Sequence, residues 1–305
     1  MGLVATTHDS NWPPASSLLS STPRAERVNV ALVGLGTYAT SLTPRSPTST
    51  PAALRAALER YSTWSYSDQV DLAELVALVD HGDVEEPDGP DVLERLRSIT
   101  DTLDDRYALR VVLGGDNAAT WHALRAMASG SLSDWGLITL DAHLDLRDGV
   151  SNGSPVRQLL EAGLPGTSVV QVGLADFSNS AAYARRARDA GITVISRDTL
   201  RSEPVEQAAQ RALAVAGAKG RRVYVDVDMD AADRSVVPGC PAAAPGGLSA
   251  DEMRRFVRYV TGDARVAAMD LTEIDVERDS ADQRTVRLGA LLVLEALAGV
   301  RRRRT

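Results

Sequence analysis

The sequence predicts an α/β domain built on a parallel β-sheet with helices on both of its faces. Two observations lead to this fold class. From residue 28 onward, short β-branched runs alternate with segments of helical periodicity, which is typical of repeated βαβ units. In addition, polar motifs follow four of the predicted strands, and the carboxyl ends of parallel strands meet at one rim of a sheet, where ligands bind.

The strands are predicted from short apolar, β-branched runs, and the helices from apolar residues that recur every three or four positions. The predicted strands cover residues 28–34, 70–79 (a strand or a short helix), 109–113, 137–141, 169–173, 193–195, 222–226 and 266–270. The predicted helices cover residues 51–61, 91–105, 118–128, 154–162, 179–190, 203–216, 249–261 and 283–299. Pro51 fits the first turn of its helix. The Gly34-Leu35-Gly36 turn lacks the third glycine and the helix start of a dinucleotide-binding fingerprint.

We expect one domain over residues 28–300, because no linker or internal repeat interrupts it. Residues 1–27 are rich in Ser, Thr and Pro and are predicted to form a flexible N-terminal arm. Residues 301–305 form a basic tail, which we expect to be solvated.

The composition narrows the range of functions. The 305 residues carry a net charge of −8, which argues against a nucleic-acid partner. No apolar run is long enough to span a bilayer, so we expect no membrane partner. The single cysteine, Cys240, excludes an internal disulfide framework and a thiolate zinc cluster, and it fits a cytoplasmic location.

The strongest chemical signal follows the strand at 137–141. The segment Asp141-Ala142-His143-Leu144-Asp145 places two carboxylates and an imidazole at the end of a strand. Burying unpaired anions costs several kcal/mol or more, so a divalent metal between Asp141 and Asp145 is expected. An exposed acidic loop with a chance histidine is the alternative.

A second segment strengthens the metal hypothesis. The run VYVDVDMD at 223–230 is a β-branched strand that continues into Asp226, Asp228 and Asp230. Strand alternation places Asp226 and Asp228 on the same side. The oxygen and nitrogen donors of the two segments suit Mn²⁺ better than Mg²⁺ or Zn²⁺, and they could hold two ions with a bridging hydroxide.

Five motifs, in order, resemble the ureohydrolases, the family of arginase, agmatinase and formimidoylglutamase. Gly114-Gly115-Asp116-Asn117 resembles the family's GGDH loop, the segment 141–145 its DAHxD motif, and Asp226-Val227-Asp228 its DxD motif. The segment PGCPAAAPGGLS at 238–249 resembles its PGGL loop, and Asp270-Leu271-Thr272-Glu273 its late, substrate-contacting segment. The resemblance covers residues 28–299 and implies a three-layer α/β/α sandwich around a sheet of about eight strands. It also implies a homo-oligomer (a trimer or hexamer) and two Mn²⁺ ions.

The resemblance implies a set of metal ligands. Asp141 and Asp226 would bridge the two ions, His143 and Asp228 would complete one site, and Asp145 and Asn117 would complete the other. The family's usual ligand at position 117 is histidine. The amide oxygen of Asn117 is a weaker donor, so we expect that site to bind metal weakly or to be empty.

The same resemblance implies the chemistry. A metal-activated hydroxide would attack the planar carbon of an amidine or guanidine. Asp145 would take its proton and pass it to the departing amine. Glu273 would hold the cationic nitrogen end of the substrate by a charge-assisted hydrogen bond, unless it only pairs with an arginine.

The loop after the DAHxD motif indicates the substrate. The segment SNGSPVR at 151–157 resembles the loop of formimidoylglutamases and lacks the histidine of arginases and agmatinases. Arg147 and Arg157, with Ser151 and Asn152, are predicted to bind a carboxylate-bearing substrate, although Arg157 could instead pair with a nearby Asp or Glu. The leading hypothesis is hydrolysis of N-formimidoyl-L-glutamate to L-glutamate and formamide, a step of histidine breakdown. The alternatives are a urea-releasing agmatinase, guanidinobutyrase or arginase, and a metal-poor relative that only binds a ligand.

Overall fold

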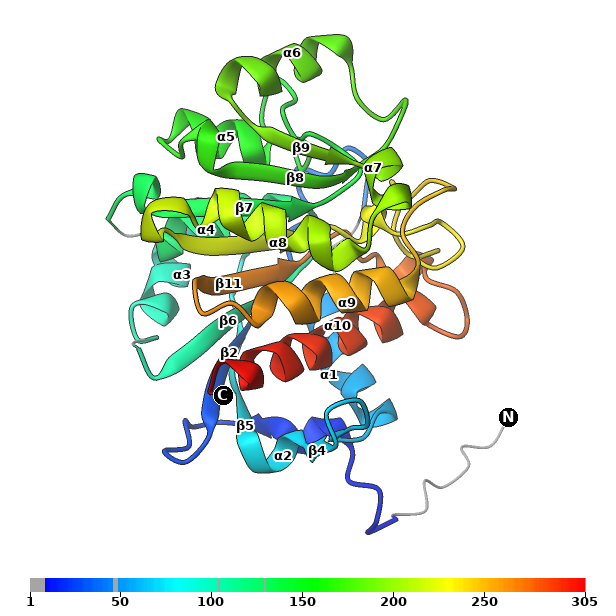
Figure 1. Ribbon diagram of the computed structural model, residues 1–305. Helices are drawn as coiled ribbons and strands as arrows, with labels where there is room; N and C mark the ends of the chain where they lie inside the picture. Colours follow the sequence, from blue (N-terminus) through cyan, green and yellow to red (C-terminus); the bar gives the residue numbers. More distant parts are fainter. Residues whose placement is uncertain (1–8, 46–48, 104, 129, 305) are drawn as a thin grey trace.

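A parallel sheet of nine strands runs through the middle of the molecule (Figure 1). The computed structural model describes residues 9–45, 49–103, 105–128 and 130–304. In spatial order the strands are β1 (Leu19–Ser20), β5 (Val76–Asp83), β2 (Val28–Leu35), β6 (Tyr107–Gly114), β11 (Val266–Leu271), β10 (Arg222–Val227), β7 (Trp135–Leu140), β8 (Val169–Leu174) and β9 (Thr193–Ser196). Every neighbouring pair in this sheet is parallel. The eight predicted strands are therefore present, and β1 adds a ninth at one edge.

The central strands are apolar because helices cover both of their faces. Every residue of β2, β7, β8 and β11 is buried. A strand that is buried on both faces has a continuous apolar sequence instead of an alternating one, which is the pattern that the sequence shows.

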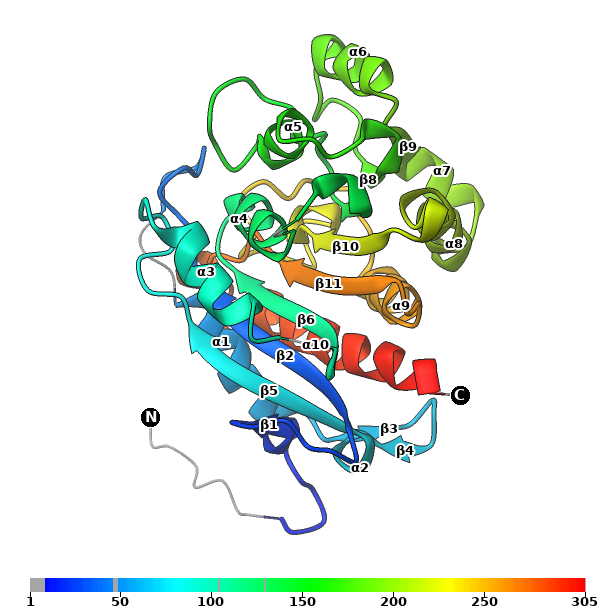
Figure 2. The same ribbon diagram turned by 90° about the vertical axis from the view of Figure 1, so that its left-hand side faces the viewer.

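Helices form a layer on each face of the sheet, so the three-layer α/β/α prediction is confirmed (Figure 2). One layer contains α1 (Thr50–Ala57), α8 (Val205–Ala216), α9 (Ala250–Thr261) and α10 (Arg284–Arg301). The other layer contains α3 (Val92–Thr100), α4 (Ala118–Met127), α5 (Pro155–Glu161) and α6 (Ala181–Ala190). The short helices α2 (Leu72–Leu75) and α7 (Arg197–Ser202) and the antiparallel pair β3 (Trp64–Ser65) and β4 (Val70–Asp71) lie near the ends of the sheet. None of the described helices is both long and apolar enough to cross a membrane.

Described residues near both ends of the chain contact the central sheet. Of the expected flexible arm 1–27, residues 1–8 lie outside the described residues, whereas Ala15 and Leu18 are buried and β1 pairs with β5. In the basic tail, Arg303 donates to the backbone carbonyls of Ala108 and Val266, at 2.6 and 2.9 Å. The guanidinium of Arg303 thus packs against the amino ends of two central strands.

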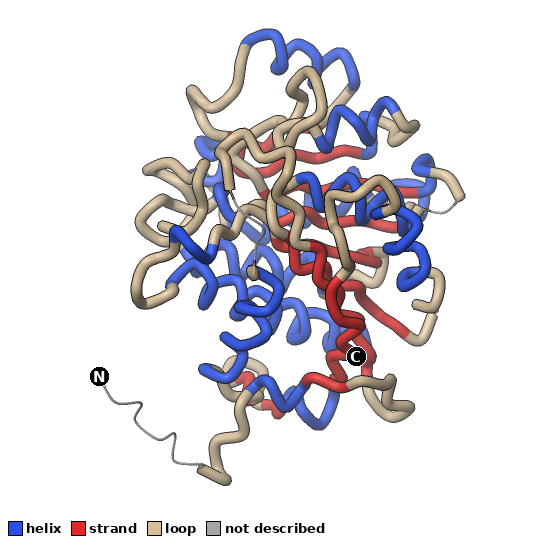
Figure 3. Tube along the Cα trace, turned by 180° about the vertical axis from the view of Figure 1, so that it is seen from behind, coloured by secondary structure: helices blue, strands red, loops and turns tan. Residues whose placement is uncertain are grey.

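The loops that follow the parallel strands gather on one side of the sheet (Figure 3). The four motif loops follow β6, β11, β10 and β7, and these four strands are direct neighbours in the sheet. Chain segments that are far apart in sequence are thereby brought to one rim.

Candidate metal centre

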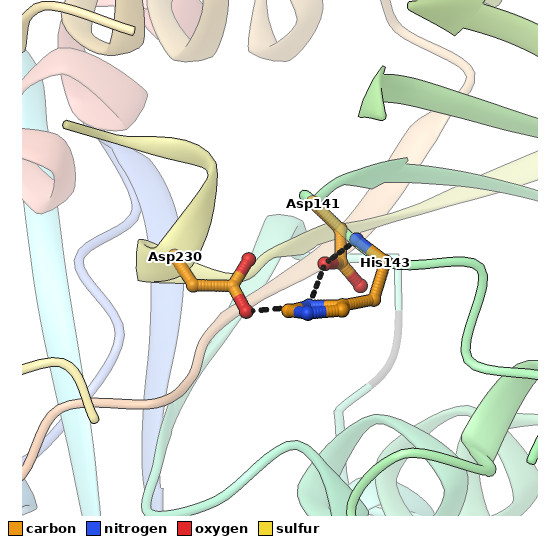
Figure 4. Close-up of side chains that lie close together, drawn as sticks. All are labelled: Asp141, His143 and Asp230. Atoms are coloured by element: carbon orange, nitrogen blue, oxygen red, sulfur yellow. Dashed lines mark hydrogen bonds and ion pairs between the residues drawn. The ribbon is translucent and has the colours of Figure 1, made fainter. Parts of the chain in front are cut away.

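His143 lies between two carboxylates at this rim (Figure 4). Its Nδ1 atom is 2.8 Å from Oδ2 of Asp230 and 3.5 Å from Oδ1 of Asp141. The backbone N–H of His143 also donates to Oδ1 of Asp141, at 2.6 Å. Carboxylates that follow two different strands, β7 and β10, therefore fix the imidazole ring.

The carboxylate beside His143 is Asp230, whereas the family resemblance implies Asp228 as the residue that completes this site with His143. Strand β10 ends at Val227, so Asp228 begins a turn, and its Oδ1 accepts the backbone N–H of Asp230 at 2.8 Å. The turn brings Asp230 to the imidazole, and Asp228 lines the same cavity. Asp230 could have been found from the sequence, because the alternation of aspartates in VYVDVDMD continues to it.

A second cluster shares Asp141 with the first. Oxygens of Asp141, Asp145 and Asp226 all lie within 4.8 Å of one another, as do donor atoms of Asp141, His143 and Asp230. Within the described part of the chain, Oδ2 of Asp141 and Oδ2 of Asp226 have no hydrogen-bond partner although both are buried. The two clusters offer two groups of convergent donors joined at Asp141.

The pKa values of His143 and of its two carboxylate neighbours are shifted in different directions. Burial by itself would lower the pKa of His143, but Asp230 and Asp141 raise this pKa to about 11. Burial, helped by the neighbouring Asp230, raises the pKa of Asp141 to about 6. Burial would raise the pKa of Asp230 too, but the contact with His143 holds it below its ordinary value.

The other carboxylates of the site are crowded by negative charge. Burial in the first place, and neighbouring carboxylates in the second, raise the pKa values of Asp145, Asp226 and Asp228 well above the usual range. Desolvated carboxylates of this kind are stabilised by positive charge placed between them. Convergent oxygens with one imidazole are the donors that Mn²⁺ binds, so the residues fit two divalent cations.

The side chain of Asn117 faces the cluster through its amide nitrogen. Nδ2 donates to Oδ2 of Asp145 at 2.5 Å, and Oδ1 accepts from the hydroxyls of Thr120 and Thr272, at 2.7 and 3.3 Å. In this orientation the oxygen that could bind a metal points away from Asp145. Asn117 thus lies at the predicted place but acts there as a hydrogen-bond donor.

Glu273 is buried at the edge of the same cluster. Its Oε1 accepts from the backbone N–H of Asn117 and from Nδ2 of Asn152, both at 2.8 Å. Oε2 lies 3.5 Å from the guanidinium of Arg45. Burial raises the pKa of Glu273 to about 7, although Arg45 acts in the opposite direction. Glu273 and Asp145 both have a positive φ, at 60° and 52°, which is strained for these residue types and typical of functional positions.

A cavity of about 550 Å³ opens above the cluster. It is lined by Asp145, Glu273 and Asn152, and by the exposed Arg147. Within the described residues no carboxylate forms an ion pair with Arg147. The cavity therefore has carboxylates at its floor and one uncommitted guanidinium on its wall.

Two of the predicted substrate residues lie outside the lining of this cavity. Arg157 pairs with Glu161 at 2.6 Å and donates to the backbone carbonyl of Arg147 at 2.6 Å and to that of Gly149. Ser151 is buried in the turn of its own loop, where its backbone N–H donates to Oγ of Ser154. These two residues support the loop that carries Arg147 and Asn152. Arg45 was not predicted, because nothing in its local sequence indicates a contact with Glu273.

Several known proteins are similar to this chain in sequence and in fold. The sequence profile of the Arginase family matches residues 28–299. The formimidoylglutamase of Halalkalibacterium halodurans is 32% identical over 278 residues, which cover 88% of this chain and 86% of that protein. The formimidoylglutamase of Bacillus subtilis is 31% identical over 284 residues, which cover 89% of this chain and 87% of that protein.

Solved structures agree with the sequence relatives. The crystal structure of formimidoylglutamase from Bacillus subtilis superposes with a TM-score of 0.86 at 28% identity, covering 97% of this chain and 94% of that one. An asparagine-to-histidine variant of formiminoglutamase from Trypanosoma cruzi, with Mn²⁺, has a TM-score of 0.86 at 25% identity, covering 96% and 99% of the two chains.

Proposed function

This chain belongs to the arginase family, and we propose that it is a formimidoylglutamase, which hydrolyses N-formimidoyl-L-glutamate to L-glutamate and formamide. The observation that carries the proposal is that one cavity is lined by both the carboxylate of Glu273 and the uncommitted guanidinium of Arg147. This substrate has a cationic formimidoyl group at one end and carboxylates at the other. It matches both charges, whereas agmatine has no carboxylate for Arg147.

The metal clusters supply the remaining chemistry. We propose two Mn²⁺ ions, one held by Asp141, Asp226, His143 and Asp228, with Asp230 beside the imidazole, and the other held by Asp141, Asp226 and Asp145. When bound, such ions would act as Lewis acids and lower the pKa of a water molecule to near neutrality. Asn117 is the predicted further ligand of the second site, and its amide nitrogen faces Asp145.

The side chains around the cavity have distinct roles in this proposal. Glu273 would bind the formimidoyl nitrogen, and Arg45 and Asn152 keep its carboxylate in place. Arg147 would bind a substrate carboxylate by charge-assisted hydrogen bonds. Asp145 would accept a proton from the attacking water as the C–O bond forms, and would then deliver it to the departing amine nitrogen as the C–N bond breaks.

The remaining features of the proposal follow from the sequence. We propose that Asn152 orients Glu273 and contacts substrate, and that Ser151 and Arg157 support the substrate loop. A homo-oligomer, trimeric or hexameric, and a cytoplasmic location are also part of the proposal, the latter because Cys240 is the only cysteine.

The proposed function is tested by product analysis. Mn²⁺-loaded protein is incubated with N-formimidoyl-L-glutamate, and formamide and glutamate are measured; agmatine, arginine and guanidinobutyrate are tested in parallel for urea. Formamide and glutamate in equal amounts, absent from the chelator-treated control and from Glu273→Gln, support the proposal. Urea instead would keep the metal chemistry and refute the formimidoylglutamase assignment, and urea from agmatine, which has no carboxylate, would also refute the role of Arg147. No product from any substrate, together with low metal content, would favour a non-catalytic relative.

A further inference from the structure

Two side-chain amides hold the backbone of the loop that carries His143 and Asp145. One of them is Asn179, which lies between β8 and α6. Its Oδ1 accepts the backbone N–H of Leu144 at 2.8 Å, and its Nδ2 donates to the backbone carbonyl of Ala142 at 3.0 Å. Asn179 therefore binds the residue on each side of His143 in the sequence.

The second amide is that of Gln171 in strand β8. Its Nε2 donates to the backbone carbonyl of Leu144 at 2.6 Å. This carbonyl belongs to the peptide group that joins Leu144 to Asp145, whose φ of 52° lies in the sparsely populated left-handed region. A residue keeps such a conformation when its surroundings fix it, and Gln171 fixes the peptide group that precedes Asp145.

A glutamine is unfavourable at position 171 unless its amide has a role. Its neighbours in β8 include Val170 and Val172, and Gln171 itself is completely buried. Its Oε1 has no hydrogen-bond partner within the described residues. Burial of an unpartnered polar atom costs free energy, and an apolar side chain at this position would avoid that cost. The contact with the loop 141–145 therefore explains the residue type.

Asn179 uses both the donor and the acceptor of its amide. Leu144 offers an N–H group and Ala142 a carbonyl, so these partners determine which amide atom is oxygen and which is nitrogen. An ionised aspartate of the same shape could accept but not donate, and an alanine could do neither. The two amides thus supply hydrogen bonds that neighbouring strands supply inside a sheet.

The loop 141–145 also has anchors that do not involve these amides. The side chain of Leu144 is buried in the hydrophobic core, and the backbone N–H of Ala175 donates to the carbonyl of Ala142 at 3.0 Å. Loss of one amide should therefore leave the loop in place and loosen the peptide groups beside His143 or Asp145.

We infer that Asn179 and Gln171 are positioning residues with separate targets: Asn179 orients the imidazole of His143, and Gln171 orients the carboxylate of Asp145. The inference rests on the proposed two-metal hydrolase, in which His143 and Asp145 belong to different sites. Neither amide is a metal ligand, because each acts through the backbone of the loop. Side chains that orient metal ligands typically affect metal affinity about 10- to 100-fold.

Metal titrations in single-site backgrounds test the two targets without reference to activity. Asp145→Asn retains the site of His143, and His143→Asn retains the site of Asp145. Each chelator-treated protein is titrated with Mn²⁺, and free Mn²⁺ is followed by electron paramagnetic resonance. Asn179→Ala should lower the affinity about 10- to 100-fold in the Asp145→Asn background, and Gln171→Met should do so in the His143→Asn background. Each change should have a smaller effect in the other background.

The same titration of the single amide variants covers the case in which a background binds no ion. With both sites intact, each variant should still bind two Mn²⁺ ions per chain, one of them about 10- to 100-fold more weakly than the original protein does.

Two control variants separate positioning from general damage. Val170→Ala removes buried apolar contacts from the opposite face of the same strand as Gln171. Ser180→Ala removes the side-chain cap that accepts the backbone N–H of Tyr183 at 3.1 Å, directly after Asn179. Both controls should lower the melting temperature of the chelated protein and retain the original affinity for both ions.

The outcomes distinguish the inference from the proposed function. If the original protein releases formamide but both amide variants bind both ions as tightly as it does, the positioning role is refuted and the proposed function stands. Equal weakening of both ions by Asn179→Ala and Gln171→Met, or by the controls, would refute separate targets. If the original protein binds fewer than two ions, the two-metal premise fails and the inference with it. Urea in place of formamide, with the affinities lowered as expected, would refute the proposed substrate and support the inference.

Discussion

The guanidinium of Arg45 lies 3.5 Å from the carboxylate of Glu273, and both side chains are almost completely buried. The second guanidinium nitrogen donates to the backbone carbonyl of Ile274 at 2.5 Å. Arg45 therefore contacts the loop after β11 twice, behind the carboxylate that faces the cavity. This arrangement makes Arg45 a positioning residue for Glu273.

We expect Arg45→Met to impair substrate binding more than the chemical step. Removing one partner of a buried ion pair leaves the other charge uncompensated, at a cost of about 3–5 kcal/mol. Asn152 and the backbone of Asn117 still hold Glu273, so we expect an unfolding free energy lower by about 3 kcal/mol and a KM raised about 10- to 100-fold. Urea unfolding and steady-state kinetics measure both. Arg45→Lys should have a KM between those of the original protein and Arg45→Met. A lower kcat with an unchanged KM in Arg45→Met would contradict the positioning role.

A second prediction contrasts the two arginines of the substrate loop. Arg147 lines the cavity, whereas Arg157 is engaged with Glu161 and two backbone carbonyls. Arg147→Ala removes a charge-assisted contact with a substrate carboxylate and should raise KM about 10- to 100-fold, with kcat little changed. Arg157→Ala should raise KM less. The assignment of Arg147 fails if the two variants are equally impaired, or if Arg157→Ala is the worse one.

A third prediction concerns Arg197, which supports the metal loop from behind. Its guanidinium is buried and donates to the backbone carbonyls of Asp230 at 2.9 Å, Ala231 at 3.3 Å and Gly173 at 3.1 Å. Unpaired buried carbonyls cost about 1–3 kcal/mol each, so Arg197→Met should lower the unfolding free energy by several kcal/mol.

The effect of Arg197 on metal binding is the more specific readout. Because the turn at Asp230 would lose its support, we expect Mn²⁺ affinity to fall about 10-fold or more, as for other partners of metal ligands. Arg201→Met, an exposed change in the same helix α7, is the control and should leave metal affinity unchanged. Unaltered Mn²⁺ binding in Arg197→Met would show that the turn holds Asp230 without Arg197.

Much of this site follows from the sequence because it depends on local patterns. Buried parallel strands give continuous apolar runs, and Asp141 and Glu273 appear immediately beyond such runs. Because the strands that carry the motifs are parallel neighbours, their carboxyl ends place the motifs side by side. For this reason the sequence alone predicts the fold, the edge of the sheet at which the motif loops meet, and the carboxylates and imidazole of segment 141–145.

The remaining features depend on contacts that no local pattern records. Arg45 and Glu273 are 228 residues apart, and only the folded loop brings them together. Whether Asp228 or Asp230 contacts His143 depends on where β10 ends, and a strand end is uncertain by a residue or two from sequence alone. Arg157 turns toward Glu161, one helical turn away, and this neighbour competes with any substrate.

The last prediction concerns the stability of the protein after chelation, which should fall as the pH rises. The folded-state pKa values of Asp141 and Glu273 are about 6 and about 7, above the values of about 4 for unfolded chains. Between these values the folded protein binds protons that the unfolded chain has lost, so unfolding becomes easier with increasing pH.

His143 changes stability in the same direction. Its folded pKa of about 11 lies above the unfolded value of about 6.5, so its contribution is complete below about pH 6.5 and is lost as the pH rises through about 11. Asp230, with a lowered pKa, opposes this trend only in more acidic solution, below its unfolded value of about 4.

The melting temperature of the chelated protein should therefore be higher at about pH 5 than at about pH 8. We expect a difference of about 5 °C or more from the usual dependence of melting temperature on unfolding free energy. Scanning calorimetry at constant ionic strength measures the difference. Mn²⁺ binds the deprotonated carboxylates, so saturating Mn²⁺ should raise the melting temperature most at about pH 8 and reduce or reverse the slope. Asp198→Asn, an exposed change, should leave the slope unaltered. A chelated protein that is more stable at about pH 8 would mean that these carboxylates are not crowded in the folded state.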